Sequence, residues 1–132
     1  METEFEFRLE HSRLFGTIHR PVARVIFINQ EREFPQWAYV DSGADMTLIP
    51  KSLGDLIGFK VSDQEEIKEV KGVGERGIPV ILKKTNIQIG DKKIESHVAW
   101  SLIEEVPLLL GRKDVFDTFE IIFKNNKTVF RC

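Results

Sequence analysis

The sequence predicts an all-β domain that closes or folds over on itself, and three observations support this. Short stretches with alternating polar and apolar residues, or with many β-branched and aromatic residues, recur along the chain. Turn-forming pairs such as Gly90-Asp91 and Asn125-Asn126 separate several of these stretches. Only two segments have the residues of a helix, and both are short. Many short strands with frequent turns are typical of a closed β-domain.

The first third of the chain contains three expected strands. Residues 4–9 alternate polar and apolar side chains, as a half-buried strand does. Residues 22–28 are mostly apolar and form the second strand. The polar residues 29–32 make a turn, and the chain returns as a strand over residues 34–40, with Pro35 near its start, where strands tolerate proline.

A short helix is expected next. Pro50 suits the first turn of a helix, and Gly58 is placed to end it. Residues 67–82 then form an arm that extends and returns around three glycines. The rest of the chain is expected to form two hairpins, a buried strand and a second short helix. These are the hairpin of residues 86–89 and 94–100, the buried strand 106–110, the helix 112–119, and the hairpin of residues 119–123 and 127–131.

Composition indicates one folded domain over residues 1–132. Hydrophobic residues make up 42% of the chain and charged residues 30%, which excludes a disordered chain. No window approaches the roughly 20 apolar residues of a membrane span, and the first residues do not resemble a secretory signal. The net charge of −2 argues against nucleic acid as a partner. Cys132 is the only cysteine, which fits the reducing cytoplasm.

Residues 39–49 carry the strongest functional signal. An apolar run ends on an acid at Asp41, Ser42 and Gly43 follow, and an apolar pattern then resumes. An ionised carboxylate at the buried end of a strand is costly unless its charge is used. Taken alone, Asp-Ser-Gly is also common in surface turns. In this context the segment resembles the active-site motif of the retroviral-type, or retropepsin-like, aspartic proteases.

A second landmark of that family lies 70 residues downstream, counted from Asp41 to Gly111. The apolar run 106–110 ends in Gly111, and a short helix is expected after it. In the family this run crosses the loop of the catalytic aspartate, and the glycine allows close backbone approach. The resemblance also implies that Arg112 pairs with Asp45. Without the family, the same residues describe an ordinary buried strand with a solvated arginine.

The glycine arm is the third landmark. Residues 72–77 read Gly-x-Gly-x-x-Gly, but a dinucleotide site needs a helix directly after the glycines, and β-branched residues follow instead. The resemblance implies a flap that closes over a bound peptide, covering it with Gly72, Val73 and Gly74. Glycines suit such a moving tip. An ordinary hairpin tip remains the alternative from sequence alone.

One Asp-Ser-Gly per chain has a chemical consequence. Aspartic protease chemistry needs two adjacent carboxylates that share a proton, so two chains must bring Asp41 to Asp41 on a two-fold axis. The resemblance assigns Ser42 to a hydrogen bond across that axis and Gly43 to an amide near the carboxylate. It assigns Ala44 and Asp45 to holding an extended peptide as an added strand.

The sequence therefore predicts a homodimeric aspartic endopeptidase of retropepsin fold that acts on polypeptides. No metal or other cofactor is expected, because His11, His19 and His97 lack metal-ligand spacing. A non-catalytic peptide-binding or dimerisation module of the same fold is the alternative. The resemblance covers about residues 20–123. Outside these residues, both ends of the chain differ from those of the retroviral enzymes, which intertwine their termini at the dimer interface. The resemblance therefore does not predict how the two chains would meet.

Overall fold

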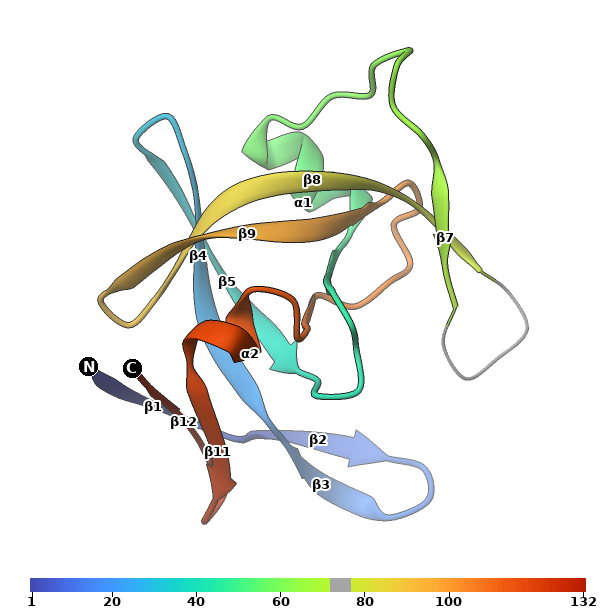
Figure 1. The fold of residues 1–132 in the computed structure, drawn as a ribbon. Helices are drawn as coiled ribbons and strands as arrows, with labels where there is room; N and C mark the ends of the chain where they lie inside the picture. The colour runs from blue at the N-terminus through green and yellow to red at the C-terminus, as the bar shows by residue number, and fades with distance from the viewer. Residues whose placement is uncertain (72–76) are drawn as a thin grey trace.

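The computed structural model describes residues 1–71 and 77–132, and this part of the chain is built mostly of strands (Figure 1). The predicted all-β class is therefore confirmed. In a row of six strands, each is hydrogen-bonded to the next. The first and last of them, β4 and β8, also pair, so the sheet closes into a barrel. Their order around the barrel is β4 (Val22–Asn29), β5 (Arg32–Val40), β10 (Leu109–Leu110), β6 (Thr47–Ile49), β9 (Lys92–Ser101) and β8 (Ile78–Ile89).

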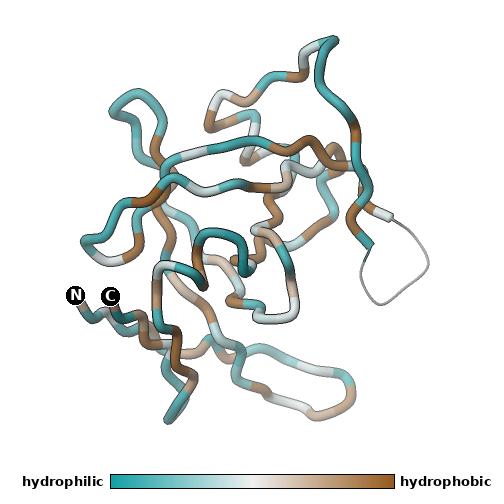
Figure 2. The backbone as a smooth tube through the Cα atoms, viewed as in Figure 1, coloured by the Kyte–Doolittle hydropathy of each residue, from teal (hydrophilic) through white to brown (hydrophobic). Residues whose placement is uncertain are grey.

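The core lies inside this barrel. Trp100, Phe27 and Phe130 are among the largest fully buried side chains. Helix α1 (Lys51–Ile57) closes one side, and its Gly54 leaves the space that the Trp100 indole fills. Polar loops join the outer ends of β4 and β5 and follow α1 (Figure 2). The buried apolar area supplies most of the folding free energy.

A small second sheet joins the two ends of the chain. Strand β12 (Lys127–Arg131) pairs with β1 (Glu2–Glu6) on one side and with β11 (Glu120–Lys124) on the other. The termini lie side by side (Figure 1), and the N-terminal ammonium group donates a hydrogen bond to the carbonyl oxygen of Cys132. Cys132 is exposed as a free thiol. Phe130 packs edge-on against Phe5 and Phe119, which attaches this sheet to the core.

Several expected elements are confirmed. Strands β4 and β5 cover residues 22–28 and 34–40, and the two predicted hairpins turn at Gly90-Asp91 and Asn125-Asn126. Helix α1 begins after Pro50 and ends at Gly58, which has φ +105° and so takes the left-handed conformation that glycine favours. Strand β7 (Lys68–Val70) and the start of β8 form the arm of residues 67–82, whose tip lies outside the described residues.

Other elements differ from the prediction. The expected strand 4–9 is divided, because Phe7 bonds to Asn126 and the chain leaves the terminal sheet there to form β2 (Arg8–Ser12). Strand β3 (Gly16–Arg20), which pairs with β2, was not predicted. The buried strand 106–110 is reduced to β10, because a tight turn bonds Val106 to Glu104. The second helix, α2 (Val115–Thr118), starts late, after Asp114 with φ +67°.

Candidate active site

Asp41 lies directly beyond the buried end of β5. Strands β5 and β10 run parallel, with Val40 opposite Leu110, and both of these residues are buried. The Asp41 amide donates a hydrogen bond of 3.0 Å to the carbonyl oxygen of Leu110. The carboxyl group therefore leaves the barrel where two core strands end, and it is partly exposed to solvent.

The loop after Asp41 folds back on the carboxylate. The Gly43 amide donates a 2.9 Å hydrogen bond to the Asp41 Oδ1, and the Ala44 amide donates one of 3.2 Å to the Asp41 carbonyl oxygen. A Cβ on Gly43 would lie 3.3 Å from the same Oδ1, so a glycine leaves this carboxylate oxygen uncrowded. An amide donor fixes the direction of the carboxylate.

The second sequence landmark crosses this loop, as the resemblance implied. The Arg112 and Lys113 amides donate 2.9 Å hydrogen bonds to the carbonyl oxygens of Ala44 and Asp45. The Gly111 amide donates to the buried Thr47 hydroxyl at 3.1 Å. A Cβ on Gly111 would overlap the carbonyl group of Met46, so only glycine allows the two segments to come this close.

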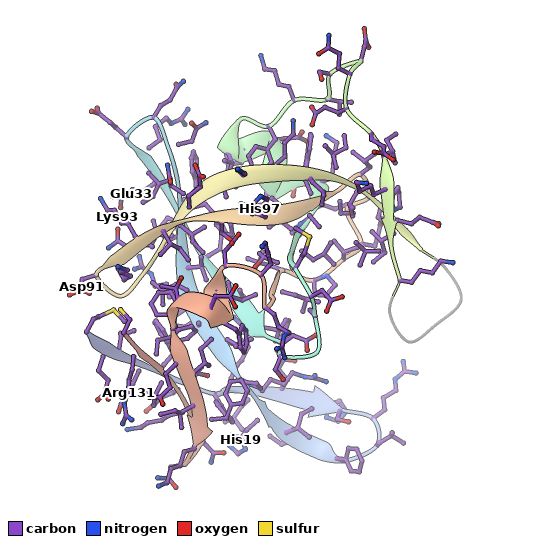
Figure 3. The ribbon with its side chains drawn as sticks, viewed as in Figure 1. His19, Glu33, Asp91, Lys93, His97 and Arg131 are labelled. Atoms are coloured by element: carbon purple, nitrogen blue, oxygen red, sulfur yellow. The ribbon has the colours of Figure 1, made fainter. Side chains whose placement is uncertain are left out.

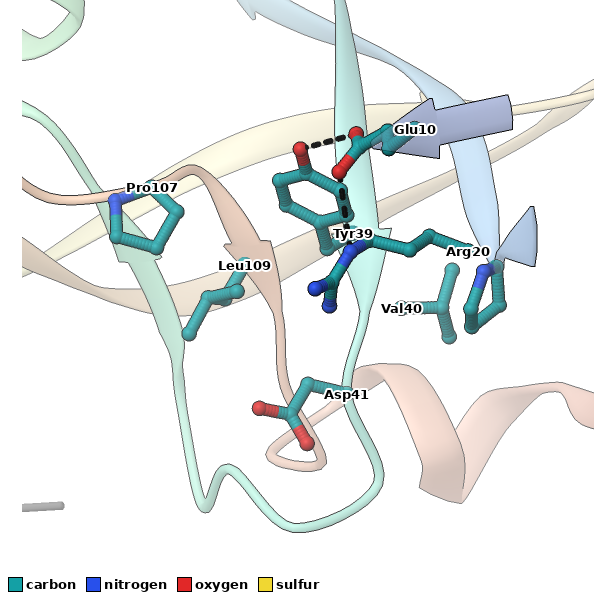
Figure 4. A pocket seen from close by; sticks show the side chains of 8 residues that line it. Glu10, Arg20, Tyr39, Val40, Asp41, Pro107 and Leu109 are labelled. Atoms are coloured by element: carbon teal, nitrogen blue, oxygen red, sulfur yellow. Dashed lines mark hydrogen bonds and ion pairs between the residues drawn. The ribbon is translucent and has the colours of Figure 1, made fainter. Parts of the chain in front are cut away.

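A cavity of about 500 Å³ opens beside Asp41 (Figure 4). Its apolar lining comes from β5, β10 and the adjoining loops, and its polar lining comes from the β2–β3 hairpin, Tyr39 and Asp41. The lining residues are Glu10, Arg20, Pro21, Tyr39, Val40, Asp41, Pro107 and Leu109. A carboxylate at the edge of a cavity next to apolar side chains is the arrangement expected where a peptide is held for hydrolysis.

Comparison with known proteins agrees with this geometry. The family model described as "Aspartyl protease" matches residues 26–113, which is more than half of the chain. The chain belongs to this aspartyl protease family. The matched range contains both Asp41 and the Gly111 segment that crosses its loop. Among curated proteins, no sequence matches the chain significantly.

Solved structures show that the fold is retropepsin-like. A retropepsin-like aspartic protease from Rickettsia conorii aligns with a TM-score of 0.65 and 12% identity, over 98% of this chain and 91% of that one. EIAV protease in complex with the inhibitor HBY-793 aligns with a TM-score of 0.53 and 16% identity, over 81% of this chain and 92% of that one. The alignment over nearly the whole chain includes the terminal segments that depart from the retroviral pattern.

The expected Arg112–Asp45 ion pair is not formed among the described residues of this aspartyl protease. Arg112 instead directs its Nη1 toward the carbonyl oxygen of Ser42, at 3.4 Å. Both side chains are exposed, and backbone hydrogen bonds already join the two segments, so an ion pair would add little. Ser42 and Gly43 are exposed on the same loop. Gly72, Val73 and Gly74, the predicted flap residues, lie outside the described residues.

Sequence reasoning missed Glu10, Arg20 and Tyr39. The Arg20 Nε lies 3.0 Å from the Glu10 Oε1, and the Tyr39 hydroxyl donates a hydrogen bond to the Glu10 Oε2. That bond and burial raise the pKa of the Tyr39 hydroxyl. Arg8 lies 3.8 Å from the same carboxylate. No local motif marks Glu10 or Arg20, and the motif of residues 39–49 does not predict the contact of Tyr39 with them, because the three residues come from strands that meet only in the folded chain.

A second polar contact holds the Gly111 segment from outside. The Asp114 Oδ2 accepts the His97 amide and lies 2.8 Å from the His97 Nδ1. The backbone hydrogen bond from His97 is the main cause that lowers the pKa of the Asp114 carboxyl. Asp114 directly follows Arg112 and Lys113, whose amides bind the Asp41 loop. Its contact with His97 therefore anchors this supporting segment to strand β9.

The histidines do not gather at one place. His97 on β9 and His19 on β3 lie in separate parts of the molecule (Figure 3). Within residues 1–71 and 77–132, no group of three or more histidine, cysteine, aspartate or glutamate side chains is arranged to hold a metal ion. In the same residues, no helix is long and apolar enough to cross a membrane.

Proposed function

We propose that this aspartyl protease is an endopeptidase that acts as a two-fold homodimer. The observation that carries the proposal is the position of Asp41, which lies partly exposed at the end of two core strands and beside the cavity. Its loop is braced by the Gly111 segment. Such bracing holds a reacting group in place with little motion, which catalysis requires.

The chemistry explains why two chains are needed. Two carboxylates within hydrogen-bond reach hold one proton between them, because both cannot ionise cheaply. The ionised member takes a proton from a water molecule, and the protonated member donates a hydrogen bond to the scissile carbonyl. Water then adds to the carbonyl carbon to give a diol, and the proton taken from the water passes to the amide nitrogen. The C–N bond breaks, which releases the amine and a carboxylic acid. One chain supplies a single Asp-Ser-Gly, so the second carboxylate is Asp41 of another copy.

The remaining roles follow from the same arrangement. Ser42 bonds across the two-fold axis, and Gly43 orients the carboxylate through its amide. Ala44 and Asp45 hold an extended polypeptide substrate by its backbone. Gly72, Val73 and Gly74 cover that substrate from the other side. The chain's own termini already pair with each other, so the contact between copies uses the face that carries Asp41.

The test is cleavage of a diverse peptide mixture, read by mass spectrometry from about pH 4 to pH 8. Wild type is compared with Asp41→Asn and with Asp91→Asn, a matched change at the exposed turn between β8 and β9 (Figure 3). We expect cuts with wild type and Asp91→Asn and none with Asp41→Asn. Peptide binding without cuts in a folded wild-type dimer would contradict catalysis and would favour the non-catalytic module.

Mixing the chains tests the shared dyad. Wild type held at constant concentration is titrated with Asp41→Asn. Exchange of subunits forms mixed dimers with a single ionisable Asp41, so we expect activity to fall as the variant is added. If each chain acted alone, the added variant would leave activity unchanged. Analytical ultracentrifugation of the same mixtures reports the dimer directly.

A further inference from the structure

The β2–β3 hairpin carries the most exposed large apolar side chains among the described residues. Leu14 and Phe15, at the turn between the two strands, are 85% and 78% exposed. In the described part of the chain, β2 and β3 pair only with each other. Figure 1 shows the hairpin extending beyond the barrel, with its tip on the opposite side of the molecule from the two termini. A two-stranded hairpin is marginally stable unless a further surface packs against it.

The tip of the hairpin is held in one conformation by hydrogen bonds. The Ser12 hydroxyl oxygen accepts the Leu14 and Phe15 amides, both at 3.3 Å. Gly16 follows with φ +73°, the left-handed conformation that lets the chain turn into β3. Because the backbone is ordered, the two apolar side chains are presented to solvent together. Little conformational entropy is therefore lost when another surface covers them.

The hairpin lies on the face of the molecule that carries Asp41. Glu10 of β2 lines the same cavity as Asp41, and it accepts the hydroxyl group of Tyr39. Strand β3 runs from the tip to the cavity over five residues. At about 3.3 Å per residue, the tip therefore lies roughly 13 Å from the cavity. In a two-fold dimer that brings Asp41 to Asp41, a segment that projects beside this loop meets the other copy.

The Asp41 loop by itself offers too little surface for a stable dimer. Ser42, Gly43 and Asp45 are exposed there, and none has a large apolar side chain. A specific interface buries about 800 Å² on each partner. The two termini, which retroviral enzymes intertwine, pair with each other within this chain. The hairpin tip supplies large apolar area on the same face, and a two-fold axis makes each of its contacts twice.

We propose that the β2–β3 hairpin is a dimerisation arm whose tip, Leu14 and Phe15, packs against a second copy of this chain. This inference rests on the proposed homodimer, and it names the surface that holds the two copies together. Each copy covers the tip of the other, which removes both apolar side chains from water. Because the hairpin also lines the cavity through Glu10, the arm joins the contact between copies to the site of Asp41.

The test measures dimerisation by analytical ultracentrifugation over a range of protein concentrations. Leu14→Ser/Phe15→Ser replaces both apolar side chains of the tip. We expect the dissociation constant of the dimer to rise about a hundredfold or more, because each copy loses two buried large side chains. Leu56→Ser/Val61→Ser is the matched control. These side chains are 53% and 56% exposed, and α1 lies on the other side of the barrel from the hairpin (Figure 1). The control should stay within about threefold of wild type.

Two further measurements separate loss of the contact from loss of the fold. The circular dichroism spectrum of the tip variant should match that of wild type, because the replaced side chains lie outside the core. Phe15→p-benzoylphenylalanine keeps an apolar ring at the tip, and on irradiation it should link two copies covalently. The same change at Leu56 should give no linked dimer. An unchanged dissociation constant in the tip variant, or no linked dimer from position 15, would overturn the inference.

Cleavage assays distinguish this inference from the proposed catalysis. The tip variant should cleave peptides slowly at low protein concentration and recover wild-type activity per dimer at high concentration, because mass action restores the dimer. A wild-type dimer that depends on the tip but cleaves nothing would retain the arm and reject the endopeptidase. Cleavage by a dimer that does not depend on the tip would retain the endopeptidase and reject the arm. A wild type that is monomeric at every concentration would reject the arm together with the homodimer.

Discussion

The loop of residues 41–46 and the hairpin of residues 8–20 meet at one cavity, yet they are held in different ways. The loop is fixed by backbone hydrogen bonds to Leu110, Arg112 and Lys113. It is also fixed by the close approach of Gly111 to the Met46 carbonyl group, which only glycine allows. The hairpin reaches the cavity through charged side chains and the Tyr39 hydroxyl. Its tip exposes Leu14 and Phe15 and is apolar (Figure 2).

The difference separates two tasks. A reacting carboxylate needs one position, and backbone contacts without side-chain freedom provide it. The hairpin is held by side chains, whose replacement changes the charge beside the cavity without disturbing the barrel. The stability of the protein should therefore be sensitive to small changes in the loop and should tolerate changes in the hairpin.

The largest effect is expected from Gly111→Ala, compared with Gly16→Ala. The new methyl group at position 111 would overlap the Met46 carbonyl, so we expect a loss of about 3 kcal/mol or more in the free energy of unfolding. Gly16, at the hairpin tip with φ +73°, has open space around it and should cost only about 1 kcal/mol of backbone strain. Urea unfolding of both variants measures the contrast. Equal losses would contradict it.

Thr47→Val should rank next. Removing the hydroxyl leaves the buried Gly111 amide without its acceptor, which should cost about 2 kcal/mol of unfolding free energy. Thr128→Val is the matched change, because the Thr128 hydroxyl is the buried side-chain polar atom without a partner in the described part of the chain. That variant should be neutral or stabilising. A neutral Thr47→Val would show that the loop does not depend on this bond.

Asp114→Asn tests the outer support of the Gly111 segment. The pKa of the folded Asp114 carboxyl lies below its ordinary value of 3.8, so its contribution is complete above pH 3.8 and is lost as pH falls through the lowered pKa. We expect the variant to lose about 1 kcal/mol at neutral pH and to approach wild type at lower pH. Denaturation at several pH values measures this. Asp117→Asn, at an exposed position of α2, is the matched change and should stay within about 0.5 kcal/mol of wild type at neutral pH.

Tyr39→Phe should have the smallest effect on stability. The Tyr39 hydroxyl bonds Glu10 at the partly exposed cavity wall, so its removal should cost less than about 1 kcal/mol. Urea unfolding of the variant beside wild type measures this loss. A loss of more than about 2 kcal/mol would contradict the expectation and show that the fold depends on this hydroxyl.

Local sequence pattern determined much of this protein. Alternation and turn residues predicted β4, β5 and the two hairpins, and Pro50 and Gly58 predicted α1, because strand period, turn conformation and helix ends depend on neighbouring residues. The Asp-Ser-Gly motif and Gly111 predicted the candidate catalytic loop and the segment that crosses it. These signals are local, or they resemble a known family.

The tertiary structure alone decided the rest. Strand β10 is only two residues long, because its partners and the turn at Val106 limit it. Arg112 bonds to Ser42 rather than to Asp45, and the N-terminal residues form a hairpin that brings Glu10 and Arg20 to Tyr39. Such contacts join residues far apart in the sequence, so no local sequence pattern predicts them. The sequence motif predicted where the carboxylate is, and only the tertiary fold, with the hairpin packed beside the barrel, decided which side chains surround it.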